Sequence, residues 1–181
     1  MTAIARYMVC LFLPASLGLV AKAFVAELIS ERVLALALLL LSVEQARMAV
    51  VDLEQIAAVS QKAKPPPRLQ WFRQVTLITI ALELLGFYIA WVNLGIGTLL
   101  VLLSQIGFNL LAGIQIDLTQ PVMLQPYGIR QRWLVLMADS IGLLLVSLWC
   151  FEIAPLETAL ALFMMVCGYG VFKYGSLFLP H

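Results

Sequence analysis

The sequence predicts an all-α fold, a polytopic transmembrane helix bundle of about six helices arranged as three consecutive hairpins. Of its 181 residues, 63% are hydrophobic and only 12% are charged, and the mean hydropathy is +1.01. Ordinary soluble domains contain far less apolar sequence. The apolar residues also form runs of the length that crosses a bilayer, which is roughly 20 residues per helix.

Six apolar runs are each expected to form one transmembrane helix. Their approximate bounds are 6–26, 33–51, 74–92, 97–116, 133–151 and 157–177. The first run also resembles a signal peptide, because Arg6 precedes it and a small-residue motif lies at 21–23. We interpret it as a membrane span.

The second run contains Glu44, Gln45 and Arg47, so an amphipathic helix on the membrane surface is the alternative to a span. Its leucine-rich start at 34–41 favours insertion.

The connections between the runs predict three hairpins, at about 6–51, 74–116 and 133–177. About four residues join the third and fourth runs, and about five join the fifth and sixth, lengths that are typical of antiparallel neighbours. Longer segments separate the hairpins. In the first of these, 52–73, we expect a cytoplasmic extension of the second helix followed by a proline-rich linker around 65–67. The chain, 1–181, is thus predicted to be a single transmembrane domain.

The distribution of lysine and arginine predicts that both termini are cytoplasmic, because positive residues near span ends are retained on that side. The residues that lie on this side are Arg6, Lys62, Lys64, Arg68, Arg73, Arg130, Arg132 and Lys173. The two tight loops on the opposite side have none. Lys22 and Lys173, near opposite membrane faces, are expected to snorkel to the interface.

Composition also excludes several classes of function. A net charge of +1 argues against nucleic acid, which requires a concentrated basic face. Cys10, Cys150 and Cys167 show no CxxC spacing, and His181 is the only histidine. We therefore expect no metal site built from cysteine or several histidines, and the sequence identifies no cofactor.

A set of polar residues inside the spans is predicted to form one layer in the bilayer. Its members are Ser16, Glu44, Arg47, Glu83, Gln105, Asn109 and Asp139. Counted at about 1.5 Å per residue, most lie roughly 10 to 15 Å from the cytoplasmic boundary. Ionisable side chains at this depth usually face the bundle interior and have a partner.

Arg47 is the predicted partner of the acidic residues, since it lies three positions after Glu44 and at a similar depth to Glu83 and Asp139. Three carboxylates and one guanidinium leave an excess of acid. At least one of the three acids is therefore expected to be protonated, or to meet a cation or solvent.

Small residues share helix faces with these polar residues, which is typical of closely packed membrane helices. Gly86 lies on the face of Glu83, Gly113 on that of Asn109, and Gly142 on that of Asp139. Gly168 and Gly170 are predicted to offer the sixth helix the same close approach.

Two interpretations of the polar layer compete. It is either a satisfied network that fixes helix register, or part of a pathway for protons, cations or a small polar solute. The second predicts a membrane-embedded subunit of a transport or energy-coupling complex, with Glu83 and Asp139 as its leading residues.

The first interpretation predicts a scaffold or assembly subunit of a larger membrane complex. An intramembrane enzyme is disfavoured, because no GxSxG, HExxH, Walker or dinucleotide motif occurs. The expected partners are the lipid bilayer, other membrane subunits, and a small solute or ion.

Overall fold

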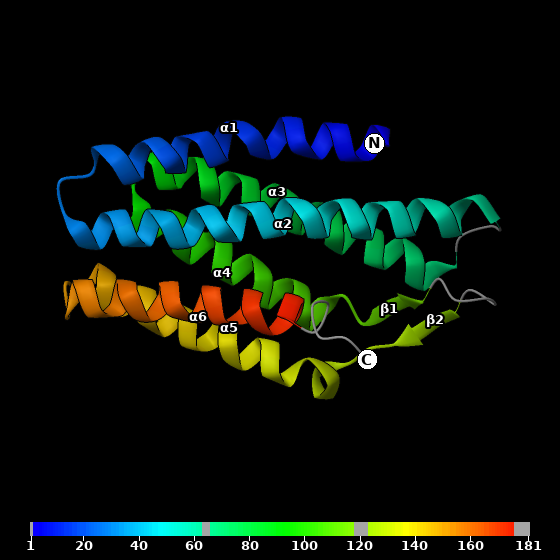
Figure 1. Ribbon diagram of the computed structural model, residues 1–181. Helices are drawn as coiled ribbons and strands as arrows, with labels where there is room; N and C mark the ends of the chain where they lie inside the picture. Colours follow the sequence, from blue (N-terminus) through cyan, green and yellow to red (C-terminus); the bar gives the residue numbers. More distant parts are fainter. Residues whose placement is uncertain (1, 63–65, 118–122, 176–181) are drawn as a thin grey trace.

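The computed structural model describes residues 2–62, 66–117 and 123–175, which form six helices and one two-stranded sheet (Figure 1). The helices are α1 (Ala3–Val25), α2 (Ile29–Lys62), α3 (Pro67–Val92), α4 (Leu94–Leu111), α5 (Ile129–Cys150) and α6 (Pro155–Gly175), and the strands are β1 (Ile114–Asp117) and β2 (Met123–Pro126). All six helices are long and apolar enough to cross a membrane. This confirms the predicted transmembrane bundle, and the chain is an integral, multi-pass membrane protein.

The helices pack as consecutive antiparallel pairs that close into a ring. α1 packs on α2, α3 on α4, and α5 on α6, while α4 also contacts α5 and α6 returns to α2. Because α2 also contacts α3, helices α2 to α6 form a closed ring, and α1 lies outside it against α2 and α3. We call the end of the bundle that carries the three short connections the loop end, and the end that carries β1 and β2 the sheet end.

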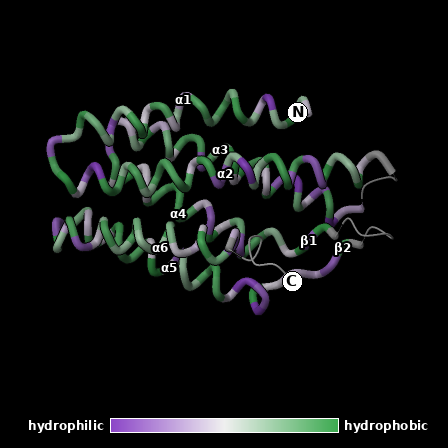
Figure 2. The backbone as a smooth tube through the Cα atoms, viewed as in Figure 1, coloured by the Kyte–Doolittle hydropathy of each residue, from purple (hydrophilic) through white to green (hydrophobic). Residues whose placement is uncertain are grey.

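The outer surface of the bundle is as apolar as a bilayer requires. Hydrophobic residues run along the lengths of the helices in Figure 2, and many large ones face outward, among them Leu144, Met164 and Phe172. Inside, Phe12 of α1 meets Phe87 of α3 edge to face, with ring centroids 6.1 Å apart. Lipid is therefore the solvent of this surface.

Glycines set the closest helix contacts. α3 and α4 are joined by Asn93 alone, whose side chain accepts a hydrogen bond from the Ile96 backbone N–H. A Cβ atom added to Gly97 would lie only 2.4 Å from the backbone nitrogen of Ala90, and one added to Gly86 would lie 3.0 Å from the Gly97 carbonyl oxygen. The backbones of the two helices therefore touch, as glycine permits in membranes.

Gly142 of α5 lies where three helices meet, because an added Cβ would lie 3.1 Å from Met165 of α6 and 3.5 Å from Leu102 of α4. Gly168 and Gly170 differ from the expectation: an added Cβ would meet no heavy atom within 4 Å at either position. Among the described residues, no close helix approach uses these two glycines.

The prediction that Gly113 lies on a helix face is wrong, because α4 ends at Leu111 rather than near 116. Gly113 adopts a φ of +63°, the left-handed conformation that commonly ends helices. Beyond it, Ile114 and Ile116 enter β1, pair with β2, and are buried against Leu69 and Phe72 of α3. The chain thus adds a small antiparallel sheet to the predicted all-α fold.

The segment between the first two hairpins is more helical than expected. α2 continues to Lys62, in line with the predicted extension, but α3 already begins at Pro67. Proline is well suited to the first turn of a helix, where its missing N–H needs no partner. The connection between α2 and α3 is therefore shorter than the linker that the sequence predicts. Positions 63–65 of that linker, and 176–177 at the end of the third predicted hairpin, lie outside the described residues.

Candidate functional site

The predicted polar residues do not form one layer but separate into three groups. Ser16 of α1 is hydrogen-bonded to Ser42 of α2 at 2.9 Å, outside the helix ring. Glu44 and Arg47 lie between α2 and α6. The remaining four, Glu83, Gln105, Asn109 and Asp139, are contributed by α3, α4 and α5.

The second group is a charged network between α2 and α6, which we call the α2–α6 network. It consists of Glu44, Arg47 and Met48 of α2 with Tyr169, Lys173 and Tyr174 of α6. Arg47 donates two hydrogen bonds to the Glu44 carboxylate, at 2.9 and 3.1 Å, and Lys173 donates a third at 2.6 Å. Tyr174 donates a fourth to the same carboxylate. Glu44 is therefore fully partnered.

Two predictions fail at this network. Lys173 does not snorkel away from the bundle but pairs with Glu44, and its side chain is only 26% exposed. Arg47 is not the partner of Glu83 or Asp139, because its guanidinium is committed to Glu44 and lies 5.4 Å from the centre of the Tyr174 ring. The acids of the bundle interior must therefore be compensated by other groups.

Those acids belong to what we call the interior cluster, which consists of Asp52 of α2, Glu83 of α3, Asn109 of α4, and Arg132 and Asp139 of α5. The Asn109 amide nitrogen donates to Asp139 at 3.0 Å, and its amide oxygen lies 3.5 Å from the Arg132 guanidinium. Asn109 therefore bridges an acid and a base.

Glu83 has the least compensated carboxyl group of the cluster. Its side chain is 2% exposed, and within the described part of the chain it forms no hydrogen bond or ion pair. The charged groups that act on it are the carboxyls of Asp52 and Asp139. A buried acid within electrostatic range of two other acids is costly when all are ionised.

Gln105 of α4 carries a buried hydrogen-bond donor on the helix that also contributes Asn109. Gln105 is 9% exposed, and its amide nitrogen has no partner among the described residues. It shares a stripe of α4 with Asn109 and with Leu102, which lies against Gly142 of α5. An unpartnered buried donor in a polar interior is typical of a site for water or a small polar species.

Four of the five members of the cluster, all except Asp52, are spread along their helices from the middle toward the sheet end. Along their own helices, Glu83 lies about 14 Å from the loop end of α3 and Asp139 about 16 Å from the loop end of α5, each near the middle of a span about 30 Å long. Asn109 lies at about 22 Å and Arg132 at about 27 Å. The arrangement is a graded series of polar groups rather than a single layer.

Two members were not predicted as site residues. Arg132 was expected only as a positive residue at the cytoplasmic end, but it is 6% exposed and donates to the backbone carbonyls of Phe108 and Ile114 at 3.5 and 3.2 Å. Its guanidinium also lies over the rings of Phe108 and Tyr127. The spacing of seven between Arg132 and Asp139 places both on one helix face and was the available signal.

Asp52 was assigned to the cytoplasmic extension of α2. It is half-buried there, and the charges that act on it come from Arg132, Lys173 and Arg47. It therefore links the interior cluster to the α2–α6 network. Its position two helical turns after Glu44, with Met48 between them, was the sequence signal.

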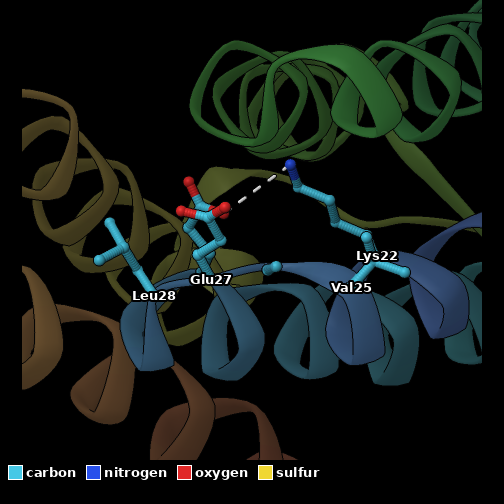
Figure 3. Close-up of a pocket in the computed structure, with 6 residues that line it drawn as sticks. Lys22, Val25, Glu27 and Leu28 are labelled. Carbon is cyan, nitrogen blue, oxygen red and sulfur yellow. Dashed lines mark ion pairs between the residues drawn. The ribbon is translucent and has the colours of Figure 1, made fainter.

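A separate pocket of about 310 Å³ lies at the loop end, at the connection between α1 and α2 (Figure 3). Lys22, Glu27 and Glu31 line it, and the Lys22 amine lies 3.8 Å from the Glu31 carboxylate. Lys22 therefore pairs across the connection instead of only snorkelling. Within the ranges that the structure describes, no three His, Cys, Asp or Glu side chains converge as metal ligands would.

Comparison with protein-family models, with curated proteins and with solved structures gives no match to this chain.

Proposed function

We propose that the chain is a membrane-embedded subunit of a transport or energy-coupling complex, in which the interior cluster relays protons. The observation that carries the proposal is the buried Glu83 carboxyl in the middle of α3, which has no hydrogen-bond partner among the described residues and lies within electrostatic range of two other acids. Ionisable residues inside membrane spans are costly, and they mark proton and ion pathways.

The graded depths of the cluster support a relay. From Glu83, polar groups continue through Asp139 and Asn109 to Arg132 near the sheet end. In this proposal, a proton that leaves Glu83 passes to Asp139, whose carboxyl acts on Glu83 electrostatically. Gln105 supplies a donor that can hold a water molecule or a small polar solute beside this series.

The proposal is tested by proton flux into vesicles that contain the purified chain with any subunits that remain bound to it. Under an imposed membrane potential, Glu83→Gln and Asp139→Asn are each expected to lose most of the flux, because neither amide can release a proton. Glu83→Asp should retain part of it.

The matched control is Glu157→Gln, which changes an exposed acid at the start of α6. It should leave the flux unchanged. Unchanged flux in a folded double variant, Glu83→Gln with Asp139→Asn, would exclude the relay.

The alternative is a scaffold or assembly subunit. It is favoured by the α2–α6 network and by the Arg132 contacts to backbone carbonyls, both of which fix helices relative to one another. If the chain is a scaffold, Glu83→Gln and Asp139→Asn should each purify with the same partner subunits as the wild type. Deletion of the chain should remove the whole complex.

We also propose that both termini are cytoplasmic. The exposed arginines Arg6, Arg68, Arg73 and Arg130 lie at the sheet end, whereas Lys22 and Arg32 at the loop end are accompanied by nearby acids. A fluorescent reporter that folds only in the cytoplasm should therefore be active when fused to either terminus. A phosphatase that is active only after export should be active when inserted at position 27, and the reverse pattern would invert the topology.

A further inference from the structure

An apolar groove of about 230 Å³ follows the outer surface of the hairpin formed by α3 and α4. Its lining from α3 runs from Trp71 to Leu82, and its lining from α4 runs from Leu100 to Leu111. None of the lining residues is charged. The groove lies on the lipid-facing side, since Trp71, Ile78 and Leu103 are each more than half exposed.

Gly107 leaves the groove open in its middle. A Cβ atom added there would meet no heavy atom within 4 Å, unlike at Gly97 on the same helix, where it would collide with α3. At the sheet end, the Trp71 indole N–H donates to the Leu111 carbonyl at 2.9 Å and so joins the two helices below the groove. The groove thus lies between two helices that are joined at its sheet end.

The length of the groove matches one leaflet of a bilayer. Each lined stretch covers eleven helical steps, which is about 16 Å. Half of a hydrocarbon core about 30 Å thick is about 15 Å. Trp71 lies at the sheet end, where an interfacial tryptophan is expected, and Leu82 lies about 15 Å from the loop end, at the midplane.

A positive charge stands at the sheet end of the groove. Arg68 lies one helical turn before Trp71 on the same stripe of α3, is exposed, and forms no ion pair with any described residue. We propose that the groove binds one acyl chain of an anionic phospholipid from the leaflet at the sheet end, with Arg68 at the phosphate. Basic residues at this position attract anionic headgroups.

The test measures phospholipid retained by the chain in mild detergent, after delipidation and re-addition of phosphatidylglycerol or phosphatidylcholine with identical acyl chains. Native mass spectrometry counts the bound lipids. The wild type should retain one phosphatidylglycerol and prefer it over phosphatidylcholine by about fivefold, as expected for one basic residue near the headgroup. Gly107→Leu should lose the retained lipid, because the new side chain occupies the groove.

Arg68→Gln keeps the groove but removes the charge, so it should bind both lipids equally. It changes an exposed side chain and does not depend on whether the glycine variant folds. Two controls are matched: Arg73→Gln removes an exposed arginine on another face of α3, and Gly168→Leu fills an open glycine on α6. Both should behave as the wild type.

Unchanged lipid retention in Gly107→Leu would overturn the proposal, as would an unchanged headgroup preference in Arg68→Gln. A second polypeptide that is retained by the wild type and released by Gly107→Leu would also overturn it, and would identify the groove as a protein interface. None of these outcomes depends on proton flux, so they are distinguishable from failure of the proposed relay.

Discussion

Replacing Gly97 by valine should lower the free energy of unfolding by about 3 kcal/mol, at the upper end of the usual cost of overpacking. At this position even a Cβ atom would lie 2.4 to 2.6 Å from the backbone and Cβ of Ala90. These atoms of Ala90 cannot move aside as a flexible side chain would, so α3 and α4 must separate to make room. Reversible unfolding in mixed micelles, followed by circular dichroism, measures the loss.

The matched control is Gly107→Val, ten residues further along the same helix. Both substitutions change the intrinsic helix propensity equally, but only Gly97 has a neighbouring helix in the way. The control should therefore be within about 1 kcal/mol of the wild type. Equal losses in both variants would contradict the packing described for this hairpin.

Replacing Arg132 by alanine should lower the free energy of unfolding by about 3 kcal/mol, the order expected when one member of a buried polar network is removed. The Phe108 and Ile114 carbonyls lose a donor, and the contacts with the rings of Phe108 and Tyr127 disappear. Arg132→Lys should be intermediate, because lysine keeps the charge but not the planar fork. The same unfolding measurement applies.

Arg130→Ala is the control for this series. Arg130 lies two residues earlier on α5 and is exposed, so its loss should change stability by no more than about 0.5 kcal/mol. If Arg132→Ala is as stable as Arg130→Ala, the carbonyls of Phe108 and Ile114 must have other donors, and the structural role assigned to Arg132 is wrong.

The transmembrane fold was predictable because the bilayer imposes a simple rule of length and apolarity on each helix. The helix ends were less predictable where backbone geometry decides them. At Gly113 the left-handed turn ends α4, although Ile114 and Ile116 continue the apolar run. At Pro67 the helix starts earlier than the prolines suggested, because proline terminates a helix only from its interior.

The candidate site was predictable in its residue types but not in its pairing. Glu83, Asn109 and Asp139 were identified because polar side chains are rare and costly in spans. Their partners depend on which helices become neighbours, and the contact of α6 with α2 brings Lys173 to Glu44 across 129 positions of sequence. Depth in the membrane, counted from sequence position, could not show that Arg47 faces α6 and that Arg132 faces the interior.

The contact of α6 with α2 also has a consequence for biosynthesis. A ribosome adds about 5 to 20 residues per second, so Glu44 waits on the order of ten seconds in the membrane before Lys173 is made. During that interval its available partner is Arg47, one helical turn away on the same helix. The local pair therefore neutralises the acid while the nascent chain is incomplete, and the lysine joins it only when the last described helix completes the ring.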